Sequence, residues 1–197
     1  MSEIMSISRH RMGTDGRGVR TLVAFYGCSL DCKYCLNRHC KQDKTPRLAM
    51  SSDDLLGLVE KDNIYFKMTD GGITFGGGEP LLAADFIRET AEKAPWSCDI
   101  ETSLYAPWED VEKLIPVIDE WFIDIKDFDS ERYKEYTGKD NEIVLSNLKK
   151  LKESGANMTI RVPYIEGFNT PMQADENARI ARKYSDKVNR FDYTLIV

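Results

Sequence analysis

Three cysteines near the start of the chain, Cys28, Cys32 and Cys35, follow the spacing C-x3-C-x2-C. Because they lie so close in sequence, one short loop can direct three thiolates toward a single point. Thiolates are soft ligands that bind zinc or iron–sulfur clusters. A four-iron cluster held by three cysteines leaves one iron free to bind and activate a small molecule, whereas a four-cysteine cluster mainly transfers electrons. The spacing therefore predicts a metal centre and leaves its type open.

The remaining cysteines and histidines bear on that choice. Cys40 follows Cys35 closely enough to be a fourth ligand, which would make the chain a non-catalytic iron–sulfur electron carrier or a zinc-binding module. Cys98 lies at the start of a predicted strand, so we interpret it as a small buried apolar residue. His10 and His39 lack the spacing of a ligand pair, and a histidine metal site is not expected.

Composition limits the protein class and its partners. The 197 residues are 42% hydrophobic and 30% charged, which predicts one globular domain over residues 1–197. A net charge of −6 favours neither nucleic acid nor anionic membranes as partners. No apolar stretch is long enough for a membrane helix or a secretory signal. Crowded cysteines fit metal binding in a reducing compartment, so a cytoplasmic monomer is expected.

Runs of β-forming residues alternate with helical patterns along most of the chain. Predicted strands cover 21–26, 72–75, 97–101, 121–125, 158–162 and 193–197, and predicted helices cover 51–59, 84–94, 108–115, 144–153 and 174–184. Residues 1–20, polar and rich in glycine, are predicted to form an N-terminal loop. Six strand–helix alternations indicate an α/β fold in which right-handed crossovers curl a parallel sheet into a barrel that stays open on one side.

The candidate motifs follow these strands in order. The cysteine loop, residues 27–41, comes after the first strand, Gly77 after the second and Thr102 after the third. Lys126 follows the fourth strand, and Arg161 lies within the fifth. Because active sites of barrel folds gather at the carboxyl ends of parallel strands, we expect these residues to surround one site.

Taken together, the motifs resemble those of the radical S-adenosylmethionine (radical SAM) enzymes. The spacing C-x3-C-x-aromatic-C, with Tyr34 as the aromatic residue, is similar to the superfamily signature. The wider frame is similar to the pyruvate formate-lyase activating enzyme branch, which activates glycyl-radical enzymes. This frame comprises Asp15–Arg20, Gly27–Cys28, Cys35–Asn37, Gly77–Glu79, Asp124–Lys126 and Arg161. Arg17 replaces the proline of the branch's Asp-Gly-Pro-Gly motif.

The resemblance implies a radical SAM core, an open parallel (β/α)6 partial TIM barrel. It implies a [4Fe–4S] cluster on Cys28, Cys32 and Cys35 that cleaves SAM reductively to a 5′-deoxyadenosyl radical, which abstracts hydrogen from a glycine of a partner enzyme. An alternative substrate is a peptide or a small molecule. Flavodoxin or ferredoxin is the expected reductant. Fuller members of the branch continue beyond the position of Val197, so a minimal, C-terminally short form is expected.

The resemblance also assigns residues to the SAM site. Tyr34 would border the adenine, although it could simply pack beneath the cluster. Gly77, Gly78 and Glu79 would approach the SAM amino group, although a glycine run before proline is also typical of a tight strand-to-helix turn. Lys126 would face the SAM end of the pocket; the alternative is a salt bridge at the rim, which would contribute little.

Three further residues complete the predicted site. Glu101 and Thr102 stand where relatives have Asp-Thr, and together with Asp124 they could hold a monovalent cation or order SAM. Arg161 lies in an otherwise apolar strand and needs an anionic partner, because an unpaired buried guanidinium is costly. A SAM carboxylate or an anionic substrate group would meet that need.

Overall fold

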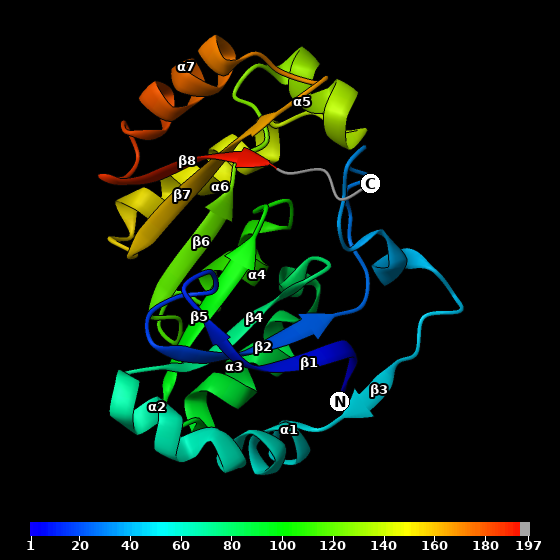
Figure 1. The fold of residues 1–197 in the computed structure, drawn as a ribbon, viewed down its shortest axis with the longest axis vertical. Helices are drawn as coiled ribbons and strands as arrows, with labels where there is room; N and C mark the ends of the chain where they lie inside the picture. Colours follow the sequence, from blue (N-terminus) through cyan, green and yellow to red (C-terminus); the bar gives the residue numbers. More distant parts are fainter. Residues whose placement is uncertain (194–197) are drawn as a thin grey trace.

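The computed structural model describes residues 1–193 and contains one twisted sheet (Figure 1). Its strand order is β3-β1-β2-β4-β5-β6-β7-β8. The bounds are β1 (Ser2–Met12), β2 (Val19–Phe25), β3 (Leu48–Met50), β4 (Gly72–Gly77), β5 (Ser97–Thr102), β6 (Glu120–Asp124), β7 (Met158–Ile165) and β8 (Lys187–Tyr193). Neighbours from β2 to β8 are parallel, whereas β1 and β3 pair antiparallel at one edge. The two edges are not joined, so the barrel is open.

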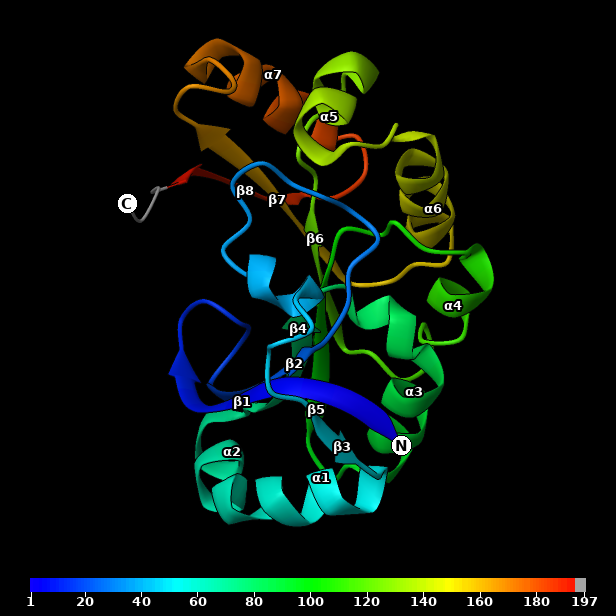
Figure 2. The same cartoon turned by 90° about the vertical axis from the view of Figure 1, so that its right-hand side faces the viewer.

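Helices connect the parallel strands. Their bounds are α1 (Ser52–Val59), α2 (Asn63–Thr69), α3 (Ala84–Lys93), α4 (Trp108–Glu112), α5 (Ser130–Thr137), α6 (Glu142–Glu153) and α7 (Pro171–Ala181), with short 3-10 turns at η1 (Arg38–Lys41), η2 (Glu60–Asp62) and η3 (Pro80–Ala83). Figure 2 shows α3, α4 and α6 along one side of the sheet. Among residues 1–193, no helix has both the length and the apolar character that crossing a membrane requires.

The two faces of the sheet differ in chemistry, because successive strand residues point to opposite sides. One face packs against the helices and forms the core. Its residues include Ile73, Phe75, Ile100, Trp121, Ile123, Ile160 and Val162. The other face is polar, and register pairs Thr74 with Asp99 and Asp124 with Arg161. The strand order thus places charged residues side by side across the inner surface of the open barrel.

Two predicted elements differ from the structure. Residues 1–20 are not a loop throughout, because β1 pairs with β2 and buries Ile4 opposite Phe25. The sixth parallel strand is β8, which begins earlier than the predicted strand at 193–197. Of that predicted strand, Tyr193 alone lies within the described residues. Helices α2 and α5 and strand β3 were not predicted, whereas the other predicted strands are confirmed to within a few residues.

Candidate functional site

The cysteine loop leaves β2 and is held at both sides by backbone hydrogen bonds. Gly27 has a positive φ of 94°, which suits glycine, and its carbonyl accepts the Glu79 N–H at 2.8 Å. On the other side, the N–H groups of Asp31 and Lys33 donate to carbonyls in the last turn of α5, each at 2.9 Å. Helix α5 therefore positions the loop against the carboxyl ends of the strands.

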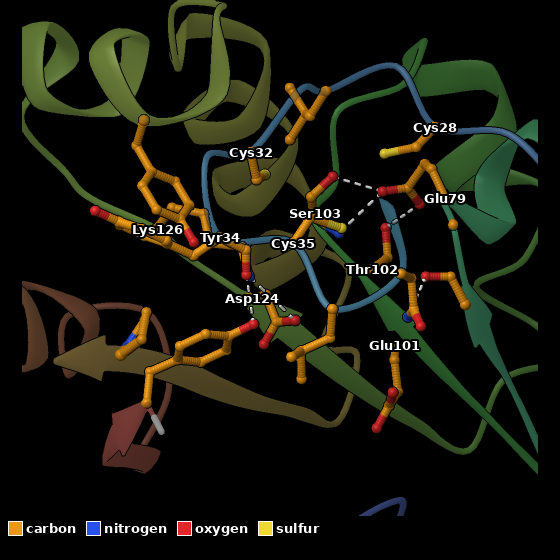
Figure 3. Close-up of a pocket in the computed structure, with 18 of the residues that line it drawn as sticks. Cys28, Cys32, Tyr34, Cys35, Glu79, Glu101, Thr102, Ser103, Asp124 and Lys126 are labelled. Atoms are coloured by element: carbon orange, nitrogen blue, oxygen red, sulfur yellow. Dashed lines mark hydrogen bonds and ion pairs between the residues drawn. The ribbon is translucent and has the colours of Figure 1, made fainter. Parts of the chain in front are cut away.

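A cavity of about 200 Å³ opens at this end of the sheet (Figure 3). Every predicted site residue except Arg161 lines it, so residues from the cysteine loop and from the ends of β4, β5 and β6 meet at one place. These residues are Cys28, Cys32, Tyr34, Cys35, Gly77, Gly78, Glu79, Glu101, Thr102, Asp124 and Lys126. Asn37 of the quoted motif also lines the cavity, together with residues that the sequence did not suggest, among them Ser103, Tyr136 and Tyr193.

All three cysteines of the motif face the cavity as free thiols, at separate positions around it (Figure 3). Within residues 1–193, no three His, Cys, Asp or Glu side chains converge tightly enough to hold a single ion. Thiols that bind different irons of one cluster need such separation, so the donor set fits a multi-iron cluster. Burial raises the pKa of Cys28 to about 12, so this thiol would bind iron only with loss of its proton.

Cys40 takes a different position. It is 1% exposed and belongs to η1, where its carbonyl accepts the Gly27 N–H at 2.8 Å. The described lining of the cavity does not include it. The geometry therefore favours three cavity thiols over a closed set of four. Cys98 is also buried, as predicted for an apolar residue.

The glycine run at the end of β4 lets the backbone pass close to the cysteine loop. Gly77 has a φ of 98°, and a Cβ on it would lie 2.6 Å from the Cα of Ala24. A Cβ on Gly78 would lie 1.9 Å from the Gly27 carbonyl oxygen. The Asn37 amide donates to the Gly77 carbonyl at 2.8 Å. A tight turn is therefore one role of these glycines, and it places their backbone at the cavity wall.

Glu79 joins the ends of β4 and β5. Its side chain is fully buried, and it accepts hydrogen bonds from the Thr102 hydroxyl at 2.6 Å, the Ser103 N–H at 3.0 Å and the Ser103 hydroxyl at 2.5 Å. The Leu81 N–H donates to it at 3.3 Å. Burial raises the pKa of Glu79 despite these donors. Ser103 was missed in the sequence, where a serine after a strand carries no distinctive signal.

A charged group forms the floor of the cavity. Arg161 donates through Nε to Asp124 at 2.8 Å and through Nη1 to Glu101 at 2.8 Å. The Lys126 ammonium lies 3.5 Å from Asp124. Two carboxylates and two cations thus balance one another in a partly buried cluster. Arg161 does not line the cavity itself but bonds to two residues that do, so Asp124 and Glu101, rather than SAM or a substrate, are the anionic partners of its guanidinium in this structure.

The charged groups of this cluster shift one another's pKa values. Burial would raise the pKa of Asp124, but Lys126 and Arg161 outweigh it, so this pKa is lowered. Burial raises the pKa of Glu101, and Arg161 offsets it only in part. Burial opposes the charge on Lys126, yet Asp124 raises its pKa. Near neutral pH, Asp124 and Lys126 are therefore a stable ion pair at the cavity wall.

Aromatic residues lie beside Lys126 and Asp124 on the same side of the cavity (Figure 3). The Tyr193 hydroxyl donates to the Tyr34 carbonyl at 2.7 Å, which connects β8 to the cysteine loop. The rings of Tyr34 and Tyr136 lie 6.1 Å apart. Tyr136 was missed because it lies on α5, a helix that was not predicted. It lies in the last turn of that helix, where its carbonyl accepts the Lys33 N–H at 2.9 Å and so helps to hold the cysteine loop.

The sequence matches the family model of the radical SAM superfamily over residues 22–183. The chain belongs to the radical SAM superfamily. Enzymes of this superfamily use a [4Fe–4S] cluster and S-adenosylmethionine. The three free thiols that face the cavity fit such a cluster.

Curated relatives place this radical SAM protein in the activating-enzyme branch. The 4-hydroxyphenylacetate decarboxylase activating enzyme of Clostridium scatologenes is 29% identical over 98% of the chain and 81% of the relative. The pyruvate formate-lyase 2-activating enzyme of Escherichia coli is 32% identical over 85% of the chain and 68% of the relative. For the (2S)-3-sulfopropanediol dehydratase activating enzyme of Klebsiella oxytoca, the identity is 35% over 63% of the chain and 40% of the relative. The matched part of the chain thus covers from 40% to 81% of the length of these three relatives.

Solved structures agree with the fold. A domain of a pyruvate formate-lyase activating enzyme from Bacteroides vulgatus is 28% identical, with a TM-score of 0.51 over 62% of this chain and 76% of that one. Streptococcus suis SuiB bound to S-adenosylmethionine is 18% identical, with a TM-score of 0.64 over 89% of this chain and 38% of that one. The predicted open parallel (β/α)6 partial TIM barrel is confirmed.

Proposed function

We propose that this radical SAM protein activates a partner enzyme by generating a radical on one of its glycine residues. The observation that carries the proposal is the meeting of three free thiols, a glycine turn and the Asp124–Lys126 ion pair at one cavity. The activating enzymes among the relatives support the choice of a protein glycine as substrate. When bound, the cluster and SAM supply an electron and a carbon–sulfur bond whose cleavage yields a hydrogen-abstracting 5′-deoxyadenosyl radical.

The proposal gives each wall of the cavity a task. Cys28, Cys32 and Cys35 would hold the cluster and leave one iron for the amino and carboxylate groups of SAM. The Lys126 ammonium suits the SAM carboxylate, because Asp124 keeps it protonated. The backbone of Gly77 and Gly78 would face the SAM amino group. Walls that exclude water protect a reactive radical until it meets the substrate.

Tyr34 and the acidic residues have the least specific tasks. The Tyr34 backbone would border the adenine, while the Tyr193 hydrogen bond holds that backbone in place. Glu79 and Thr102 would act by fixing the glycine turn, since they bond to each other at 2.6 Å. A monovalent cation near Glu101 and Asp124 would share these carboxylates with Arg161, which bonds to both of them.

Partners and location follow from the same chemistry. Because the cluster needs electrons one at a time, flavodoxin or ferredoxin is the proposed reductant. Thiols that bind iron stay reduced in the cytoplasm, which supports that location. We further propose that the protein acts as a monomer and folds as one domain. Enzymes of the kinds named for the relatives, such as pyruvate formate-lyase and 4-hydroxyphenylacetate decarboxylase, are the candidate substrates.

Anaerobic reconstitution tests the cofactor chemistry. The protein is loaded with iron and sulfide, reduced with dithionite, supplied with SAM and assayed for 5′-deoxyadenosine. Cys32→Ala should lose both iron and product, whereas the matched variant Cys40→Ala should retain both. Equal losses in the two variants would mean that Cys40 is a ligand and that the chain is an electron carrier. Zinc in place of iron in the active preparation would also overturn the proposal.

A second experiment tests the substrate. The loaded protein is mixed with a candidate partner enzyme and SAM, and electron paramagnetic resonance is used to detect a glycyl radical on that partner. A radical that appears only with both proteins supports activation. Deoxyadenosine formed without any partner radical, together with modification of a free peptide or small molecule, would favour the alternative radical SAM activity.

A further inference from the structure

One tyrosine of α5 is buried without a partner for its hydroxyl. The Tyr133 side chain is 1% exposed, and among residues 1–193 no group forms a hydrogen bond with its oxygen. A buried polar group without a partner costs free energy, so such groups are few in folded proteins. Where one persists, a water, an ion or another bound group commonly supplies the partner. The Tyr133 hydroxyl therefore points to a group that the protein binds beside it.

Tyr133 lies one turn before the contacts that hold the cysteine loop. Carbonyls in the last turn of α5 accept the N–H groups of Asp31 and Lys33, each at 2.9 Å. Cys32 lies between these two donors in the sequence, so its backbone is held against the helix. The Thr137 hydroxyl donates to the Tyr133 carbonyl at 2.8 Å, which connects Tyr133 to the same turn. The position of this tyrosine relative to the loop is therefore fixed by the backbone.

The groups that act on the Tyr133 hydroxyl include two of the three thiols. Burial has the largest effect and raises the pKa of Tyr133. Four acidic groups raise it further, in decreasing order of effect Cys32, Glu79, Tyr105 and Cys28. Each carboxylate oxygen of Glu79 already accepts two donors. A neutral thiol is only a weak acceptor, whereas a thiolate is a strong one. The hydroxyl thus lies near sulfur atoms that become good acceptors when they bind iron.

We propose that the Tyr133 hydroxyl donates a hydrogen bond to the Cys32 sulfur when that sulfur binds the cluster, and thereby sets how readily the cluster is reduced. The inference rests on the proposed function, because it assumes a cluster on the three thiols. The described cavity lining includes Cys32 but not Tyr133, so a cysteine sulfur suits the hydroxyl better than SAM or substrate does. A hydrogen bond to sulfur stabilises the reduced cluster more than the oxidised one, because the reduced cluster carries one more negative charge.

The reduction potential of the loaded protein tests this hydrogen bond without turnover. Tyr133→Phe keeps the ring and removes the hydroxyl, so its iron content should match that of the wild type. A redox titration followed by electron paramagnetic resonance should show one-electron reduction about tenfold less favourable in the variant, a shift of about 59 mV to lower potential. The matched control is Trp121→Phe, which removes another buried donor without a partner near the amino end of β6, away from the thiols. Its potential should equal that of the wild type.

Urea denaturation of the metal-free protein gives an independent readout. Because neutral thiols are weak acceptors, Tyr133→Phe should leave the urea midpoint of the metal-free protein unchanged or raise it. A clearly lower midpoint would mean that a water or another group already bonds to the hydroxyl, and the inference would be wrong. Equal potentials in the loaded variant and the loaded wild type would contradict it as well. So would a shift that appears only with SAM bound, because the hydroxyl would then act on SAM.

Failure of the proposed function has a different signature. A wild-type protein that loads a cluster and releases deoxyadenosine, with the same potential as Tyr133→Phe, keeps the proposed function and loses only the role of the hydroxyl. A wild-type protein that takes up no iron–sulfur cluster loses the proposed function first and this inference with it. The iron content of the wild type therefore separates the two outcomes.

Discussion

The two faces of the parallel sheet come from the same strands but carry opposite chemistry. On the helix-facing side, Ile100 and Trp121 are fully buried among apolar neighbours. Their sequence neighbours Glu101 and Phe122 lie on the cavity side. There the Arg161 guanidinium bonds to Glu101 and lies 5.7 Å from the centre of the Phe122 ring. A period of two lets one short strand serve both faces. One face can therefore supply stability while the other holds charges for chemistry, and substitutions should separate the two.

The largest expected effect is on the helix-facing side. Trp121→Ala should lower the free energy of unfolding by about 3–5 kcal/mol, because it removes a large side chain from a close-packed core. Urea denaturation of the metal-free protein measures this loss. The indole N–H has no hydrogen-bond partner among the described residues, so Trp121→Phe should cost much less. A cost below about 1 kcal/mol for the alanine variant would show that the helices do not pack tightly on this face.

An intermediate effect is expected on the cavity side. Arg161→Met should cost about 2 kcal/mol near neutral pH, because it leaves Glu101 and Asp124 without their shared cation in a partly buried site. Arg161→Lys keeps the charge and loses the two-pronged geometry, so it should cost less. Urea denaturation of all three proteins provides the comparison. Equal stability of the methionine variant and the wild type would mean that the charged group contributes nothing to folding.

The same variant should change the dependence of stability on pH. The folded-state pKa of Asp124 is lowered, and Lys126 and Arg161 outweigh burial in setting it. The stability from this carboxylate is therefore present above its unfolded pKa, near 4, and is lost as the pH falls through the folded value. Removing Arg161 removes part of that gain, so the gap between wild type and Arg161→Met should shrink below about pH 4. A gap that widens on acidification would contradict this reasoning.

The helix-facing side was the easier one to predict from sequence. Uninterrupted apolar runs such as Trp121–Ile123 mark strands buried in a parallel sheet. Strand β1 was not predicted, because its register shifts between Ile4 and Ser6 and between Ser8 and Arg11. Such bulges break the alternation of apolar and polar residues that indicates a strand. Strand β8 is a half-exposed edge whose charged residues hide the apolar pattern.

The residues on the cavity side could be predicted from the sequence, but the contacts between them could not. The cysteine spacing and the position of each motif after a strand indicated one shared site. The partners of Arg161 depend on the register of β6 against β7, which long-range pairing sets. Helix α5 had readable signals, an Asp129 side chain that caps its start and Gly138 in the left-handed conformation at its end. Its polar composition concealed them, and Tyr136 was missed with it.

The smallest predicted effect falls on Glu79, which follows β4 and lines the cavity. Its carboxylate accepts hydrogen bonds from Thr102 and Ser103 and so joins two strand ends rather than balancing a charge. Glu79→Gln turns one acceptor into a donor that faces other donors, and should cost about 1–2 kcal/mol in urea denaturation. Glu79→Ala is the harsher control, because it leaves every one of these donors buried without an acceptor. If the glutamine variant unfolded as readily as the alanine variant, the negative charge would matter more than the hydrogen bonds, and the glycine turn would depend on electrostatics like the floor of the cavity.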